Sequence, residues 1–124
     1  MELIEGETLE TKINREGQLS PKETVSIALK IADALDYAWE KQKLCHGDIK
    51  PDNIILNSSG GVKLADLGLA KSMHDEKAFK DGMMATPLYA PPEIIAGDLH
   101  RVDCRSDMYS FGATIYHMLT GLPP

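Results

Sequence analysis

The chain has 124 residues, of which 43% are hydrophobic and 26% are charged, and its net charge at pH 7 is −6. This length and balance predict one modest globular domain with a single core. An acidic balance without a basic run argues against nucleic acid and anionic membrane surfaces as partners. No apolar run is long enough to span a bilayer, and no signal-peptide pattern opens the chain. We therefore expect a cytoplasmic protein, tethered to a membrane only through a segment outside this chain.

The chain opens with a strand-like segment, residues 1–6, and a short amphipathic stretch follows it. Within residues 7–16, Leu9 and Ile13 lie four positions apart, which is the spacing of neighbours on one helix face. Gly17 then interrupts the pattern, as glycine often does at helix ends. We expect a short helix over residues 7–16.

A longer helix is predicted over residues 20–42. Ser20 is placed as its N-cap, Pro21 occupies the first helical position, and Glu23 completes a capping box. Apolar residues then recur at helical spacing and predict the face that turns to the core. They are Val25, Ala28, Leu29, Ala32, Leu35 and Trp39.

The middle of the chain carries a dense polar stretch directly before an apolar run. It reads His46-Gly47-Asp48-Ile49-Lys50-Pro51-Asp52-Asn53. Pro51 fixes one φ angle and biases Lys50 away from the helical region, so a stiff loop is predicted. Two short apolar runs then flank an Asn/Ser/Gly turn and predict a β-hairpin over residues 54–65. Taken alone, the polar stretch would also suit a solvated turn before a strand.

The last part of the chain predicts a loop, a rigid segment and a buried helix. Residues 71–85 show no sustained period, which is typical of a mobile loop. Residues 86–93 are too rich in proline for a helix or a central strand. A helix is expected over about 106–120, ending at Gly121. Its predicted core face consists of Met108, Phe111, Ile115, Met118 and Leu119.

Five motifs follow one another along the chain. They are residues 1–6; His46-Gly47-Asp48-Ile49-Lys50-Pro51-Asp52-Asn53; Asp66-Leu67-Gly68; Thr86-Pro87-Leu88-Tyr89 with Pro91-Pro92-Glu93; and Asp107-Met108-Tyr109-Ser110-Phe111-Gly112. Their order resembles the hinge, catalytic loop (H-R-D-x-K-x-x-N), magnesium motif (D-F-G), A-P-E segment and central helix (D-x-x-x-x-G) of the protein kinase catalytic domain. The likeness is greatest to the bacterial and eukaryotic-like serine/threonine kinases and covers essentially the whole chain. It implies an α+β fold: a mainly helical portion of the kinase C-terminal lobe, with a short β-hairpin carrying the catalytic and metal loops.

The resemblance also implies an activity, ATP-dependent phosphoryl transfer to serine or threonine hydroxyls of protein substrates. This reaction asks mainly for positioning and for neutralisation of charge. By resemblance, Asp48 accepts or orients the proton of the attacking hydroxyl. Lys50 would neutralise charge on the γ-phosphate. Asn53 and Asp66 are expected to hold Mg²⁺, with Mn²⁺ as an alternative ion, because hard cations take oxygen ligands.

The remaining roles that the resemblance implies concern binding and support. The expected ATP contacts are Met1, Glu2, Ile4, Lys50, Asn53, Ile55 and Asp66. Thr86 and Pro87 would shape the platform for the protein substrate. His46, Glu93 and Asp107 are expected to support the site, with Asp107 bracing the backbone of the catalytic loop.

One departure from the family pattern bears on regulation. Gly47 stands where the family's catalytic loop has an arginine that receives the phosphate of an activation-loop residue. Within the expected activation segment, residues 66–93, Ser72 is the only hydroxyl residue between Lys71 and Ala85. We therefore expect that phosphorylation of this segment does not switch the protein. The leucine at position 67 of the D-F-G-like motif is a mild change.

Other departures are absences. No Gly-rich loop and no strand lysine precede Met1, so the chain is expected to be a partial kinase domain without its N-terminal lobe and last helices. On this basis we expect Glu93 to lack its family partner, an arginine, and the 124 residues alone to be inactive. The alternative hypothesis is a pseudokinase or truncated paralogue that serves as a nucleotide-binding or interaction module. Small-molecule kinases share Asp48 and Asn53 but usually lack the Thr-Pro-x-Tyr segment.

Overall fold

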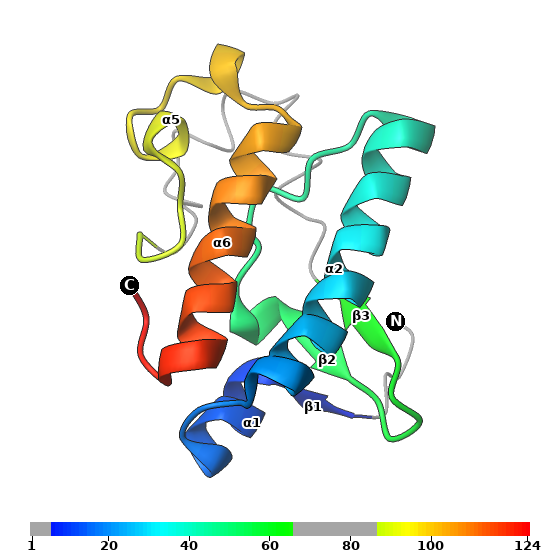
Figure 1. Ribbon diagram of the computed structural model, residues 1–124. Coiled ribbons are helices and arrows are strands. Elements are labelled where there is room, and N and C mark those ends of the chain that lie inside the picture. The colour runs from blue at the N-terminus through cyan, green and yellow to red at the C-terminus, as the bar shows by residue number, and fades with distance from the viewer. Residues whose placement is uncertain (1–5, 66–86) are drawn as a thin grey trace.

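In the computed structural model, which describes residues 6–65 and 87–124, two long helices lie beside a small sheet (Figure 1). Helices α2 (Pro21–Gln42) and α6 (Cys104–Thr120) pack side by side and run in opposite directions. Strands β1 (Glu7–Thr8), β2 (Ile54–Leu56) and β3 (Val62–Leu64) form one antiparallel sheet in that order. The predicted α+β architecture is confirmed. Five of the expected site residues lie outside the described ranges: Met1, Glu2, Ile4, Asp66 and Thr86.

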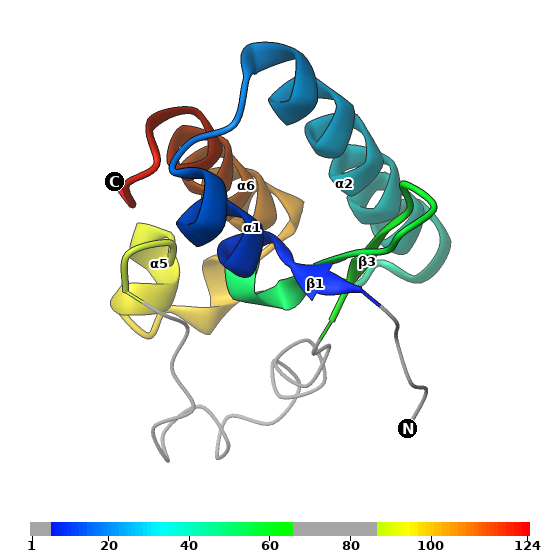
Figure 2. The same ribbon diagram turned by 90° about the horizontal axis from the view of Figure 1, so that it is seen from below.

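The first helix begins later than its apolar spacing predicts. Helix α1 spans Leu9–Glu16, and the two residues before it form β1, where Thr8 pairs with Ile55. The Thr8 hydroxyl accepts a hydrogen bond from the backbone N–H of Thr11 at 3.1 Å, which caps the helix. Leu9 and Ile13 are both buried, as their spacing predicts. Figure 2 shows α1 beside the end of α6 and the edge strand β1.

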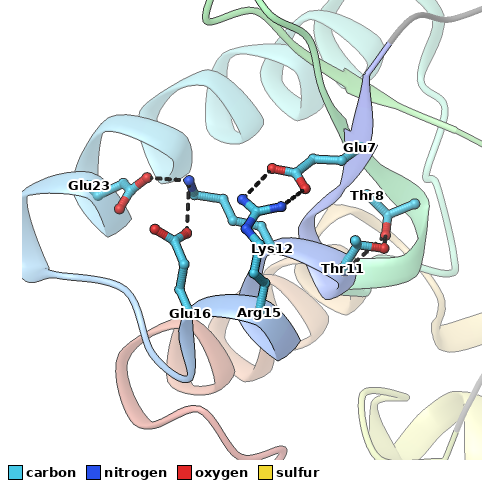
Figure 3. A network of polar contacts seen from close by, with 7 residues as sticks. All are labelled: Glu7, Thr8, Thr11, Lys12, Arg15, Glu16 and Glu23. Carbon is cyan, nitrogen blue, oxygen red and sulfur yellow. Dashed lines mark hydrogen bonds and ion pairs between the residues drawn. The ribbon is translucent and has the colours of Figure 1, made fainter.

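Two ion pairs hold α1 to its neighbours (Figure 3). The Lys12 ammonium lies 2.9 Å from the Glu16 carboxylate and 2.8 Å from that of Glu23 on α2. The Arg15 guanidinium pairs with Glu7 on β1 through both of its terminal nitrogens. The pair of Lys12 with Glu23 connects α1 to α2, and the pair of Arg15 with Glu7 connects α1 to β1.

Helix α2 has the expected N-cap but a different buried face, and the Glu23 carboxylate pairs with Lys12 instead of completing the expected capping box. The Ser20 hydroxyl accepts the N–H of Glu23 at 3.1 Å, so Ser20 is the N-cap. The predicted core stripe is wrong in part, because Val25 and Leu29 are 57% and 62% exposed. The fully buried positions are instead Thr24, Ile27 and Ile31. Apolar residues occur on more than one face of α2, so periodicity alone did not select the face that meets the sheet and α6.

The predicted β-hairpin is confirmed. Ile54 pairs with Leu64 and Leu56 with Val62, and the Asn57 side chain organises the turn. Its Oδ1 accepts the N–H of Gly61 at 2.6 Å and that of Ser59 at 3.1 Å. Asparagine commonly holds turns through such local bonds. The main core joins this hairpin to the helices through Leu9, Ile13, Leu19, Ile27, Ile31, Ile54 and Met118.

Helix α6 starts at Cys104, two residues before the earliest expected start. Asp103 is the N-cap and forms a capping box with Ser106, so the cap lies upstream of the residue that the apolar pattern selects. Gly121 ends the helix in the left-handed conformation with φ 78°, as predicted. The predicted core face is wrong for Met108, which is 66% exposed, and for Leu119.

Three short helical turns complete the described fold. The turn η1 (Pro51–Asn53) leads into β2, and η2 (Leu99–Arg101) precedes α6. Helix α5 spans Pro92–Ile95, with Pro92 in its first turn. Proline is tolerated there because a backbone N–H in the first turn has no partner within the helix. The helical turn therefore starts inside the proline-rich segment that was expected to be a loop. Within residues 6–65 and 87–124, no helix is long and apolar enough to cross a membrane.

Candidate active site

The loop at residues 46–53 is attached to α6 through the side chain of Asp107. Its Oδ2 accepts the backbone N–H of His46 at 2.7 Å, and its Oδ1 accepts that of Gly47 at 2.9 Å. Gly47 has φ 82°, a conformation that glycine adopts without a steric penalty. Burial raises the pKa of the Asp107 carboxyl, and the two N–H donors oppose this effect by stabilising the carboxylate. One buried carboxylate thus orients the start of the loop.

The His46 ring connects the same loop to the end of the hairpin. Its Nε2 lies 2.7 Å from the carbonyl oxygen of Ala65, and its Nδ1 accepts the N–H of Asp48 at 3.2 Å. These partners fit the tautomer with the proton on Nε2. The N–H of Ala65 in turn donates to the carbonyl of Asn53 at 2.7 Å. Ala65, which directly precedes Asp66 in the sequence, is therefore bonded to both ends of the loop.

Three polar side chains of the loop gather at one place. The Asn53 amide nitrogen donates to the carbonyl oxygen of Asp48 at 2.9 Å and to its carboxylate Oδ2 at 3.0 Å. The Lys50 ammonium lies 3.6 Å from the same carboxylate oxygen. The side chains of Lys50 and Asp48 are 20% and 17% exposed, so both are accessible but shielded. The Asp48 carboxylate, an acceptor, thus has both a cation and an amide beside it.

The same loop offers an oxygen atom that could bind a metal ion. Within the part of the chain that the structure describes, both hydrogen bonds of the Asn53 amide use its nitrogen, and the oxygen Oδ1 is a ligand of the type that Mg²⁺ prefers. Over residues 6–65 and 87–124, no three His, Cys, Asp or Glu side chains come together as a metal site. The expected pair of ligands includes Asp66, which lies outside the described residues. Ile55, the expected adenine contact, is half-buried on the central strand β2.

A second set of polar contacts joins α6 to the segment 89–93. The Ser106 hydroxyl donates to the Glu93 carboxylate at 2.5 Å, and the Ser110 hydroxyl donates to the carbonyl of Tyr89 at 2.7 Å. The Tyr89 hydroxyl lies 2.7 Å from Nδ1 of His117. Glu93, which was expected to lack the arginine partner of the family, thus accepts a hydrogen bond from a hydroxyl of α6.

Apart from Glu93, the residues of this second set were not identified as site residues from the sequence. A signal for them exists: Ser106, Ser110, Thr114 and His117 recur at helical spacing in a helix that is otherwise largely apolar. All four are at most 5% exposed. A polar stripe that is buried must find hydrogen-bond partners, and here it finds them in the segment 89–93 and in its own helix.

The anchored segment presents an exposed tip. Pro87 is exposed and Leu88 is 51% exposed, whereas Tyr89 and Ala90 are 7% and 4% exposed. Pro91 is buried as well, and the backbone turns at residues 87–89. The tip at Pro87 and Leu88 is thus followed by buried residues, of which Tyr89 is hydrogen-bonded to α6.

Comparison with known proteins gives the family of the chain. The family model of the protein kinase domain matches residues 1–124, so the chain belongs to this family. The chain is 39% identical to a probable serine/threonine-protein kinase PknB of Bifidobacterium longum and 39% identical to the probable serine/threonine-protein kinase CPE1738 of Clostridium perfringens. It is 33% identical to the serine/threonine-protein kinase PknB of Mycobacterium leprae. Each alignment covers the whole chain but only 18%, 18% and 20% of the relative.

Proposed function

We propose that this chain is the catalytic-loop portion of an enzyme that transfers the γ-phosphate of ATP to serine or threonine hydroxyls of proteins. The observation that carries the proposal is the side-chain group of Asp48, Lys50 and Asn53. Membership of the protein kinase domain family supports it. The names of the relatives, all serine/threonine-protein kinases, support the choice of hydroxyl.

Each member of the group has a chemical task in this proposal. The Asp48 carboxylate orients the attacking hydroxyl and accepts its proton, and Asn53 holds Asp48 through one hydrogen bond to this carboxylate and one to its backbone carbonyl. Lys50 neutralises charge on the transferred phosphoryl group. Positioning of this kind supplies most of the catalysis in phosphoryl transfer.

The metal requirement fits the oxygen that Asn53 leaves available. We propose that Asn53 Oδ1 and Asp66 hold Mg²⁺, which neutralises the phosphate charge when it is bound. Hydrogen bonds of Ala65, the residue before Asp66 in the sequence, with His46 and Asn53 support this pairing of ligands. ATP would approach over the half-buried Ile55 on β2, with Met1, Glu2 and Ile4 as further contacts.

Regulation by a phosphate on the segment 66–93 is not part of this proposal. Gly47 has no side chain to receive a phosphate, and its backbone N–H is already bonded to Asp107. A phosphate on Ser72 that raised the activity of the full-length protein would contradict this part of the proposal.

The test compares two matched carboxylate-to-amide changes in the full-length protein. Asp48→Asn removes the proton acceptor and is expected to lower phosphate transfer from ATP to a generic basic protein by roughly 10²–10⁴-fold. Asp33→Asn makes the same chemical change on the exposed surface of α2 and is expected to have no effect. Binding of ATP and Mg²⁺ is measured in parallel with a fluorescent nucleotide.

The outcomes separate the two functional classes. Transfer that depends on Asp48 supports the kinase. A full-length protein that binds nucleotide but transfers no phosphate, with or without Asp48, would support the alternative of a nucleotide-binding or interaction module.

A further inference from the structure

Tyr89 and His117 form a buried pair between the segment 89–93 and the last turns of α6. The Tyr89 hydroxyl lies 2.7 Å from His117 Nδ1, and the two rings stack with centroids 6.1 Å apart and an interplanar angle of 18°. Their exposed fractions are 7% and 5%. Neither residue touches the group of Asp48, Lys50 and Asn53 through any contact described above.

The pair fixes Tyr89 at a second point. The Tyr89 carbonyl accepts the Ser110 hydroxyl at 2.7 Å, so one residue is held to α6 through its backbone and through its ring. The two residues before it in the described chain, Pro87 and Leu88, are exposed. The two bonds therefore determine where the exposed tip lies relative to α6.

We propose that His117, in its neutral form, is a positioning residue for the protein substrate: it holds Tyr89 and thereby the tip formed by Pro87 and Leu88. The inference rests on the proposed kinase function, since it assigns a role at the substrate side of that site. With the Tyr89 hydroxyl as donor, the bond requires His117 to carry its single proton on Nε2. A protonated ring offers no acceptor at Nδ1, so this bond cannot survive protonation in the same form.

The surroundings of the pair favour the neutral ring. Burial lowers the pKa of His117 below its ordinary value of 6.5. The groups of α6 on the same face are the hydroxyls of Ser110 and Thr114, which carry no charge. From η1, the charge of Asp52 acts on Tyr89, whose pKa is raised first by burial and then by this carboxylate. Among the described residues, burial is the one cause of the lowered pKa of His117.

A pH dependence follows from the direction of this shift. Because the pKa of His117 is lowered in the folded protein, the ring stays neutral at neutral pH and through the start of acidification. Below the lowered pKa the ring gains a proton, Nδ1 no longer accepts the Tyr89 hydroxyl, and Tyr89 keeps only the backbone bond from Ser110, so that the tip is held less firmly. The affinity for the protein substrate should therefore fall at acidic pH, while the affinity for ATP should not follow the same curve.

The experiment measures KM for protein substrate and for ATP separately, in the full-length protein, as a function of pH. His117→Phe and Tyr89→Phe each remove one partner of the bond and are expected to raise KM for the protein substrate by about tenfold. His117→Gln keeps an amide oxygen as an acceptor that does not titrate. His117→Gln is expected to return KM for the protein substrate to the wild-type value. It should also abolish the part of the rise of this KM at acidic pH that comes from protonation of His117.

Two control variants match these changes. Tyr116→Phe removes a hydroxyl from the neighbouring residue of α6, which is 49% exposed, and His100→Gln replaces an exposed histidine. Both are expected to behave as wild type. An unchanged KM for the protein substrate in His117→Phe, or an acid limb that persists unchanged in His117→Gln, would overturn the inference.

A second readout keeps this inference distinct from the proposed function. Hydrogen exchange at the amides of Leu88 to Ala90 is expected to speed up in His117→Phe and to stay slow in His117→Gln. If the wild-type protein transfers no phosphate, the kinase proposal fails, and the exchange data still decide whether His117 holds the tip. Equal exchange in wild type and His117→Phe would refute the positioning role directly.

Discussion

The amide nitrogen of Asn53 donates two hydrogen bonds to Asp48, one to its carbonyl oxygen at 2.9 Å and one to its carboxylate at 3.0 Å. Asn53 therefore fixes both the backbone and the side chain of the proposed proton acceptor. The same residue keeps its amide oxygen for the proposed metal ion. The change Asn53→Asp separates these two roles, because it keeps an oxygen ligand and removes the donor.

We expect Asn53→Asp to lower phosphate transfer by the full-length protein by roughly 10²-fold, since a preorganised donor is lost and a second negative charge faces Asp48. The measurement is kcat/KM over a range of Mg²⁺ concentrations. If Asn53 acted only through the metal, Asn53→Asp would transfer phosphate at the wild-type rate at saturating Mg²⁺, because aspartate keeps an oxygen ligand. The matched control is Asn14→Asp, which makes the same change on the exposed face of α1.

Asp107 gives a prediction about the order of the catalytic loop. Asp107→Ala leaves the buried N–H groups of His46 and Gly47 without their acceptor, and each unsatisfied group costs about 1–3 kcal/mol. Asp107→Asn keeps one acceptor oxygen and should cost less. Hydrogen exchange at these two amides in the full-length protein is expected to be fastest in the alanine variant, intermediate in the asparagine variant and slowest in wild type. Asp33→Ala, on the surface of α2, is the control. Unchanged protection in Asp107→Ala would contradict the bracing role.

Gly47 gives a prediction about conformation. At φ 82°, a Cβ atom is strained, so Gly47→Ala should destabilise the folded protein by about 1–2 kcal/mol. Gly47→Asn should cost less, because asparagine tolerates the left-handed region better. Gly112 on α6 is the matched control: it has ordinary helical geometry with open space at its Cβ position, so Gly112→Ala should be neutral or slightly stabilising.

The same geometry applies to an engineered arginine at this position. Gly47→Arg supplies the side chain of the family motif but also the strained Cβ. We therefore expect a lower melting temperature in Gly47→Arg and no gain in activity from phosphorylation. An arginine variant as stable as wild type would show that the loop relaxes to another φ.

Cys45 gives a prediction about thiol reactivity. Burial raises the pKa of Cys45 to about 12, and the charges of Asp107, Cys104 and Asp103 add smaller effects in the same direction. The reactive thiolate is therefore scarce at neutral pH, and the side chain is also only 7% exposed. In native full-length protein, iodoacetamide should label Cys45 very slowly, as read by mass spectrometry of the peptides. Cys104 lines an apolar groove of about 280 Å³ between α2 and α6 and should react first.

Denaturation is the control for this prediction. In urea both thiols become accessible, and their labelling rates should converge. Fast labelling of Cys45 in the native protein would show that the loop at residues 46–53 opens far more often than its hydrogen bonds to Asp107 suggest.

Local chemistry in the sequence was sufficient for several features. The N-cap at Ser20, the hairpin around Asn57 and the C-cap at Gly121 each depend on residues only a few positions apart. The polar loop at 46–53 was recognisable for the same reason, since its motif is contiguous. Such features follow from turn, cap and backbone rules that act within one stretch of chain.

The buried faces of α2 and α6 depended on tertiary structure. Val25, Leu29 and Met108 fit an apolar stripe and yet are exposed, whereas Ser110 and His117 are polar and buried. Helices with apolar residues on several faces have no preferred inner side until another element packs against them.

What the sequence by itself determined is the family, the loop that bears the proposed chemistry and the elements that flank it. Only the tertiary structure decided how that loop is held. Asp107 and His46 are 61 positions apart in the chain, yet the backbone nitrogen of His46 lies 2.7 Å from Asp107 Oδ2 in the fold. The same holds for Tyr89 and His117, which are 28 positions apart. A hydrogen bond across such separations depends on the packing of the intervening helices and strands, and no local pattern encodes its geometry.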